Sequence, residues 1–225
     1  MEKILDNSVR GGRTIFWLKV MLGAFFVVCA LMFALVRAGV AAVPGDMDST
    51  LPMTILVLLL GTFAAGLALL VIFAIQGCYW VAWMYRSVTN LRTLGATKLH
   101  PLLAVILSVI PYVGMLIHSL VFREMVRKLD GKLTELGVEH PEVSMNKVGA
   151  FAGLYLMSII APLVNDGHVT TAIALVVGVA SMVCYISALT VYVQQEKLLQ
   201  AAGQEEIIRR KVDEVLKQRE ATSGN

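Results

Sequence analysis

The sequence predicts an all-helical, polytopic membrane bundle with four transmembrane helices, one re-entrant helical hairpin and a cytoplasmic C-terminal helix. Three observations support this fold class. Of the 225 residues, 57% are hydrophobic and only 16% are charged, and the mean hydropathy of +0.74 exceeds what a water-soluble domain carries. The apolar residues form blocks long enough to cross a hydrocarbon layer of about 30 Å. The 19 Lys and Arg residues fall mainly between these blocks, where topology signals lie.

Four apolar blocks have the length of a transmembrane helix. They cover residues 15–36, 54–78, 148–164 and 169–193. The first block is interrupted only by Lys19, which can extend to the interface, and the other three contain no charged residue. The third block has only 17 residues, so we expect its helix to begin earlier, near Pro141. The four blocks predict a membrane domain over residues 1–193.

A fifth apolar block, residues 102–120, is broken in its middle by Pro111 and Gly114. Proline removes a backbone donor and glycine permits a reversal, so we expect two half-helices of about nine residues. If this block crossed the membrane, most cations would lie outside, against the positive-inside rule. If it enters and leaves on the cytoplasmic side, Arg37 alone of the 19 Lys and Arg residues lies outside. The charges therefore predict a re-entrant hairpin.

The second block is expected to continue as a helix beyond the membrane as far as Gly95. The aromatic residues that follow it have the composition of an interfacial belt; they are Tyr79, Trp80, Trp83 and Tyr85. Arg86 and Asn90 then lie four residues apart on one helical face. We expect them to bond to each other or to cap neighbouring helix ends.

Residues 194–225 are predicted to form a cytoplasmic amphipathic helix and a short tail. The helix has apolar residues three, four or seven apart, at Leu198, Ala201, Ile208, Val212 and Val215. This stripe could pair with its own copy, pair with another protein or fold back on residues 123–136. The charge distribution predicts that both termini are cytoplasmic, in a multi-pass protein of the bacterial inner membrane.

One stretch of the chain carries a recognisable pattern, W-x-Y-R-x-x-x-N-x-x-x-L-G, followed by a proline and an Ile-Pro break. Its residues are Trp83, Tyr85, Arg86, Asn90, Leu94, Gly95, Pro101, Ile110 and Pro111. The pattern resembles that of a bacterial membrane family known as domain of unknown function 4328, and residues 191–195 are similar to the end of its last span. The resemblance implies a multi-pass membrane protein and gives these residues, with Gly114, a structural role. It implies no reaction.

Small residues four apart allow membrane helices to approach closely. Gly149 and Gly153 form one such pair, and Ala174 and Gly178 form another. We expect both pairs to be helix-packing sites, although such pairs also arise by chance.

The sequence contains no constellation typical of catalysis, of metal binding or of a cofactor. His100, His140 and His168 lie in different connections, and no phosphate loop, HExxH or GxSxG motif is present. His118 is expected at the membrane interface, and Cys29, Cys78 and Cys184 are expected to be small buried residues. We therefore predict no catalytic residue, no metal and no cofactor.

These observations favour a non-enzymatic integral membrane protein. We expect an accessory, scaffold or assembly subunit whose partners are the lipid bilayer and a protein, or a second copy, bound through cytoplasmic segments. The modest net charge of +3 gives no indication of nucleic acid. The alternative is a small channel or transporter, with the Pro111–Gly114 break lining the path.

Overall fold

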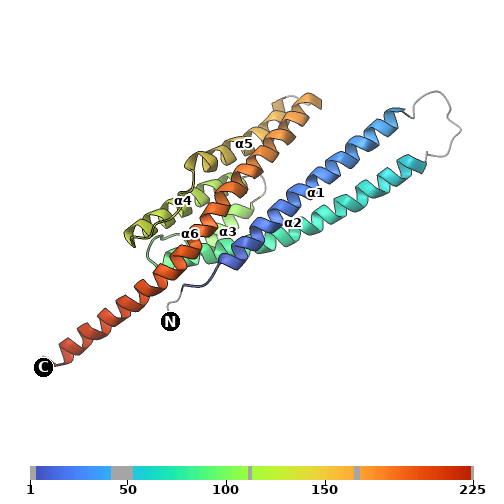
Figure 1. Ribbon diagram of the computed structural model, residues 1–225. Helices are drawn as coiled ribbons and strands as arrows, with labels where there is room; N and C mark the ends of the chain where they lie inside the picture. Colours follow the sequence, from blue (N-terminus) through green and yellow to red (C-terminus); the bar gives the residue numbers. More distant parts are fainter. Residues whose placement is uncertain (1–3, 42–52, 111–112, 165–167, 224–225) are drawn as a thin grey trace. The chain divides into compact units, whose positions relative to one another are not determined.

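The computed structural model describes residues 4–41, 53–110, 113–164 and 168–223, and this part of the chain is helical with short connections (Figure 1). It contains no strand within these ranges. The helices are α1 (Ser8–Ala41), α2 (Met53–Thr93), α3 (Pro101–Val109), α4 (Gly114–Glu135), α5 (Met145–Val164) and α6 (His168–Ser223). The predicted all-α class is confirmed.

Four of these helices, α1, α2, α5 and α6, are long and apolar enough to cross a membrane. Each of the four predicted spans lies entirely within one of them. The chain therefore has the helices of a multi-pass membrane protein. The helices extend past their apolar blocks. The longest extension is in α6, which has 56 residues.

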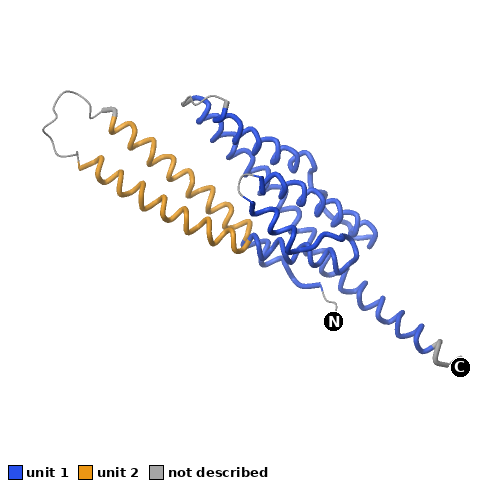
Figure 2. Tube along the Cα trace, turned by 180° about the vertical axis from the view of Figure 1, so that it is seen from behind, with its two compact units in different colours: residues 1–13, 80–225 blue, residues 14–79 orange. Residues whose placement is uncertain are grey.

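The chain divides into two compact units, residues 1–13 with 80–225 and residues 14–79 (Figure 2). The second unit contains most of α1 and the first part of α2, which run in opposite directions. Its large apolar side chains are widely exposed, among them Phe26, Phe33, Phe63 and Phe73. Exposure of this kind suits helices that are surrounded by lipid rather than water.

The larger unit contains the packed core. Within it α5 packs along α6, α3 packs against α4, and α4 contacts both α5 and α6. The core is rich in aromatic and long aliphatic side chains that are almost fully buried; these include Trp83, Phe122, Leu129, Leu133, Phe151, Tyr185, Leu189 and Tyr192. This core holds the C-terminal end of α2 against α4 and α6.

The fifth apolar block is broken into two helices, as predicted. Pro101 occupies the first turn of α3, where its missing N–H costs nothing, and Pro111 lies outside the described residues. Gly114 begins α4, and a Cβ there would lie 2.6 Å from the carbonyl oxygen of Ser108, so the reversal requires glycine. The second helix is longer than expected because it continues without a break to Glu135.

The ends of α2 and α5 test two further predictions. Gly95 ends α2 with φ of +70°, and Ala96 N–H donates to Leu91 O, so glycine closes the helix as predicted. α5 begins at Met145 rather than near Pro141. That prediction was wrong because the carbonyl of Pro141 accepts a hydrogen bond from Gln195 Nε2 at 2.7 Å.

α6 runs without a break through residues 193 and 194, where the sequence suggested a change from membrane to cytoplasmic helix. Its buried face after that point is formed by Leu199, Gly203 and Ile207. The predicted stripe is instead exposed at Ile208, Val212 and Val215. The neighbouring face of α6 packs instead, with Gly203 beside Ile4 and Leu94.

The two predicted packing pairs differ. Ala174 is buried, and a Cβ at Gly178 would lie 3.7 Å from Ser158 Cβ of α5, so this pair lies at the α5–α6 contact. A Cβ at Gly149 or Gly153 would meet nothing within 4 Å. The Gly149–Gly153 pair thus makes no close helix contact within the described chain, since its face of α5 is not the one against α6.

Candidate functional site

The C-terminal end of α2 holds the short segment that precedes α1. The Asn90 amide pairs with the backbone of Leu5 in both directions: Leu5 N–H donates to Oδ1 at 3.1 Å, and Nδ2 donates to Leu5 O at 2.9 Å. One turn earlier on the same face, Arg86 Nη1 donates to Asp6 O at 3.2 Å. These side chains supply partners to backbone groups that no helix satisfies. We call this arrangement the N-terminal clamp.

A buried carboxylate completes the clamp. Glu196 of α6 accepts a hydrogen bond from Trp83 Nε1 at 2.8 Å and another from Asn7 Nδ2 at 3.1 Å. Asn7 Nδ2 also donates to Trp83 O at 3.0 Å. Glu196 is only 7% exposed, and Trp83 and Asn7 are buried with it. The carboxylate therefore joins three distant segments: the N-terminal segment, α2 and α6.

The side chains that donate these hydrogen bonds to Glu196 belong to Trp83 and Asn7. Both are neutral donors rather than an Arg or Lys. Removing a carboxylate from water is costly unless its oxygens gain hydrogen bonds, and these donors supply them. One turn earlier on α6, the Tyr192 hydroxyl lies 2.8 Å from Ser87 Oγ, and its ring packs edge-on against Trp83. The clamp is thus a continuous polar and aromatic contact between α2 and α6.

An aromatic cluster extends from the clamp into the core. Phe122 of α4 contacts both Tyr192 and Tyr185, and Tyr185 stacks on Phe151 of α5. The Tyr185 hydroxyl accepts a hydrogen bond from Trp80 Nε1 at 3.0 Å and lies 2.9 Å from His118 Nε2. Tyr185 thus links Trp80 of α2 to His118 of α4.

His118 is fully buried among the side chains of this cluster, and its expected position at the membrane interface stays a prediction. The ring sits among Trp80, Phe122, Phe151 and Tyr185. Its Nε2 bonds to Tyr185, and its Nδ1 has no hydrogen-bond partner among the described residues. The histidine therefore packs as part of the aromatic cluster.

Two titrating groups outside the spans have shifted pKa values. Hydrogen bonds from the Ser8 hydroxyl and backbone N–H lower the pKa of Asp6, whose carboxylate caps the start of α1. The pKa of His140 is raised, first by its bond to Val138 O and then by its bond to Asp130. Asp6 thus fixes the start of α1, and His140 fixes the connection between α4 and α5.

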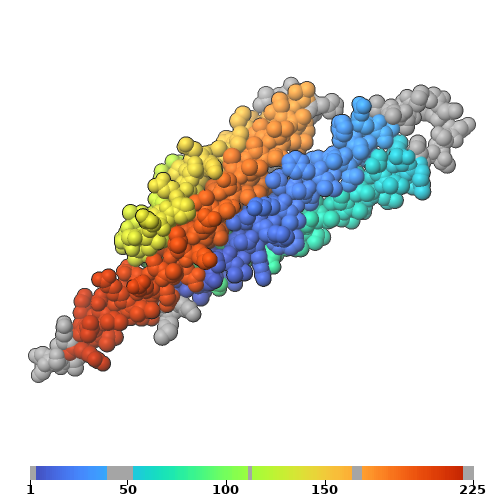
Figure 3. Space-filling view, viewed as in Figure 1, coloured from blue at the N-terminus to red at the C-terminus, as the bar shows by residue number. Residues whose placement is uncertain are grey.

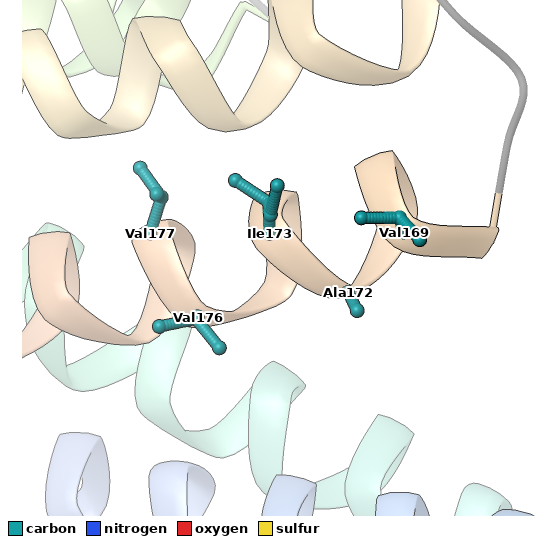
Figure 4. Close-up of a pocket in the computed structure, with 5 residues that line it drawn as sticks. All are labelled: Val169, Ala172, Ile173, Val176 and Val177. Carbon is teal, nitrogen blue, oxygen red and sulfur yellow. The ribbon is translucent and has the colours of Figure 1, made fainter.

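An apolar hollow along α6 presents no polar group to a ligand. It has a volume of about 470 Å³ and is lined by Val169, Ala172, Ile173, Val176 and Val177. Figure 4 shows Ile173 and Val177 directed toward α5, and Ala172 and Val176 on the other side of the helix. Because it presents only hydrocarbon, this groove suits lipid or another apolar helix face rather than a polar substrate.

Within the described residues, no group of three His, Cys, Asp or Glu side chains could hold a metal ion. Cys29, Cys78 and Cys184 are free thiols, and Cys78 is exposed while the other two are half-buried. The prediction that all three are buried was therefore wrong, because their helices turn these faces away from the core.

The structure brings together part of the predicted residue set. Trp83, Arg86 and Asn90 lie in the clamp, and Gly95 and Pro101 form the turn from α2 to α3. Tyr85 is exposed and takes no part in the clamp. Arg86 and Asn90 do not bond to each other; they bind the chain ahead of α1, the second of the two roles predicted for them.

Sequence reasoning missed Glu196, Asn7, Ser87 and Tyr192. Glu196 lies in a charged stretch of the sequence, which predicts a solvated side chain. Its partner Asn7 is 189 positions away. One signal was available: Trp83, Arg86 and Asn90 fall three and four residues apart on a helix, so their polar groups share one face.

Comparison with models of protein families, with curated proteins and with solved structures yields no match over this chain. The geometry of the clamp and of the helix ends is therefore the basis for any functional conclusion.

Proposed function

We propose that this chain is a non-enzymatic accessory or scaffold subunit of a membrane complex, and that it recruits a cytoplasmic protein through the end of α6. One observation carries the proposal. Beyond Ile207 the residues of α6 are exposed as far as Arg219, and Figure 3 shows this red end of the helix projecting past α4 and α5. This free end exposes Ile208, Val212, Val215 and Leu216, each close to half or more. Apolar residues on a solvent-facing helix are typical of a helix-binding surface.

The spacing of the exposed residues indicates a helical partner. Ala201, Ile208 and Val215 are seven residues apart, and so are Leu198, Glu205, Val212 and Arg219. These two sets form the seam positions of a coiled coil. A partner helix with an apolar seam of the same period would cover the stripe.

Charges in the seam disfavour a second copy of this chain. Two copies in one membrane enter it in the same orientation, so their α6 helices would run parallel. In register, Glu205 would then face Glu205 and Arg219 would face Arg219, and like charges at seam positions are destabilising. Arg209 and Lys211 flank the seam as further positive charges. The proposed partner is therefore a different protein, with a basic residue opposite Glu205 and acidic residues opposite Arg209, Lys211 and Arg219.

The N-terminal clamp supports this proposal by fixing the base of the free helix. Glu196, Leu199 and Gly203 hold α6 to α2 and to the N-terminal segment just before it leaves the core. A helix that is fixed at its base presents its free end with less loss of entropy on binding.

A photo-crosslinking residue at Val212 tests the proposal in cells. We expect it to capture one specific protein, which then binds the purified full-length chain. The double variant Ile208→Gln, Val212→Gln should weaken that binding by at least about tenfold. The control, Glu214→Gln with Lys217→Gln, keeps the net charge and introduces the same residue on another face. Crosslinks only between copies of this chain, or equal binding by both variants, would overturn the proposal.

The location is part of the same proposal: a bacterial inner membrane with both termini in the cytoplasm and residues 102–120 as a re-entrant hairpin. Single cysteines at Glu135, Asp166 and Gly224, with the three native cysteines replaced, test it. We expect an impermeant thiol reagent to label only position 166 in whole cells. Labelling at 135 would contradict the re-entrant arrangement and leave the partner test unaffected.

A further inference from the structure

A second hollow, of about 640 Å³, lies between the loop that follows α2 and one face of α4. The loop contributes residues 95–99, and α4 contributes Leu120, Val121, Glu124 and Lys128. Those α4 residues lie on one side of the helix and line one side of the pocket, and the loop lines the other. Gly95, with φ of +70°, forms the turn that brings the loop back over α4. All of these residues belong to the larger unit.

One end of the pocket is positively charged. Lys98 comes from the loop and Lys128 from α4, and both side chains are exposed. Glu124 lies 3.8 Å from Lys128, a long ion pair whose two side chains are each almost half exposed. Such a pair contributes little to stability, so Lys128 is available to another anion. The pocket carries one positive charge in excess.

The other end of the pocket is apolar and exposed. Leu120 is 65% exposed at its edge, and Leu102 and Leu103 are exposed at the start of α3. Along α4 the exposed residues change from apolar at Leu120 to charged at Arg123. Where the exposed residues of a membrane helix change from apolar to charged, the helix passes from the hydrocarbon to the headgroup region. The pocket lies at that level.

We propose that this pocket binds the headgroup of an anionic phospholipid. Lys98 and Lys128 contact the phosphate, and Leu120 lies along the first part of an acyl chain. Glu124 accepts a hydrogen bond from a headgroup hydroxyl and excludes headgroups with a second acidic group nearby. Lysines between helices at the membrane surface recognise lipid phosphates in this way. The site is distinct from the α6 stripe and does not depend on the proposed partner.

Native mass spectrometry of the full chain in detergent, titrated with phosphatidylglycerol, tests the site. The pocket variant carries Lys98→Gln and Lys128→Gln. The control carries Arg123→Gln and Arg127→Gln, which remove the same charge from α4 without touching the pocket. We expect the tightest phosphatidylglycerol site to weaken about tenfold in the pocket variant and less than about twofold in the control. Equal weakening in both would show diffuse surface attraction and overturn the proposal, as would no weakening in either.

Two further arms identify the ligand. Phosphatidylcholine should bind at least about tenfold more weakly than phosphatidylglycerol, because its headgroup has no net charge; equal binding would overturn the charge recognition. Glycerol phosphate should fail to displace the lipid at equal concentration, because it lacks acyl chains. Displacement by glycerol phosphate would show a site for soluble phosphate and overturn the lipid assignment. A Leu120→Gln variant should weaken phosphatidylglycerol binding while leaving the charged groups in place.

Discussion

Two neighbouring stretches of α6 reverse the usual distribution of polar and apolar side chains. In residues 192–207, the buried face includes Gln195 and Glu196. In residues 208–219, the exposed surface includes Ile208, Val212, Val215 and Leu216. The first stretch is held by hydrogen bonds to Asn7, Trp83 and Pro141, and the second is exposed along its whole length. The buried polar groups of the first stretch join it to the rest of the unit, and the exposed apolar residues of the second are the ones that we propose contact a partner.

The sharpest test of the polar stretch removes its carboxylate. Glu196→Ala leaves the buried Trp83 Nε1 without an acceptor and removes one of the two acceptors of Asn7 Nδ2, which should lower the free energy of unfolding by about 3 kcal/mol. Glu196→Gln keeps the size and one oxygen acceptor, so its cost should be about 1 kcal/mol. Unfolding in mixed micelles, followed by circular dichroism, measures both. Equal costs for the two variants would mean that the carboxylate acceptors do not hold the clamp.

A smaller effect is expected where the clamp holds the chain end. Asn90→Ala removes both hydrogen bonds to the Leu5 backbone and should release the N-terminal segment at a cost of about 2 kcal/mol. Hydrogen exchange at the Leu5 amide should become faster. Thr89→Ala is the control, since its hydroxyl bonds only to Tyr85 O within α2. Unchanged exchange at Leu5 in Asn90→Ala would show that other contacts hold the segment.

The pH dependence of stability offers a weaker test within the larger unit. Bonds to Val138 O and Asp130 raise the pKa of His140 in the folded chain above its ordinary value of 6.5. Its contribution is therefore full below the pKa of the unfolded chain and is lost as pH rises through the raised folded value. Melting temperatures across this range should fall less steeply with pH in His140→Ala than in the native chain. An identical pH profile for the two would contradict the assignment.

The smallest effect on stability is expected in the apolar stretch. Ile208→Gln with Val212→Gln should change the free energy of unfolding by less than about 0.5 kcal/mol, because neither side chain is packed. The same micelle experiment measures it. A loss of 2 kcal/mol or more, roughly that of a buried aliphatic side chain, would show that this part of α6 is packed and would remove the contrast between the two stretches.

Much of the fold was predictable because it depends on local or periodic features. Four helices of spanning length follow from uninterrupted apolar runs, and the end of α2 follows from Gly95, which adopts a positive φ at little cost. Gly114 marks the break before α4 for a related reason: a side chain there would strike the Ser108 carbonyl. The role of Arg86 and Asn90 in capping was also within reach, since both lie on one helical face.

The clamp itself was not predictable from one sequence. Glu196 and Asn7 are polar residues in polar surroundings along the chain, and only the packing of α6 on α2 removes them from water. The stripe on α6 was misplaced for a similar reason. Its apolar period is correct, but the face one residue away, with Leu199, Gly203 and Ile207, meets Ile4 and Leu94.

By itself, the sequence determined the helices, their apolar lengths and the positions where proline and glycine interrupt them, because backbone sterics and hydrophobicity act over a few residues. The tertiary structure alone decided which polar groups lose water and which apolar ones keep it. His118 became a core residue, Glu196 became a link between three segments, and Ile208 and Val212 remained exposed. Burial is a property of the neighbours that packing brings together, and those neighbours lie up to 189 residues apart.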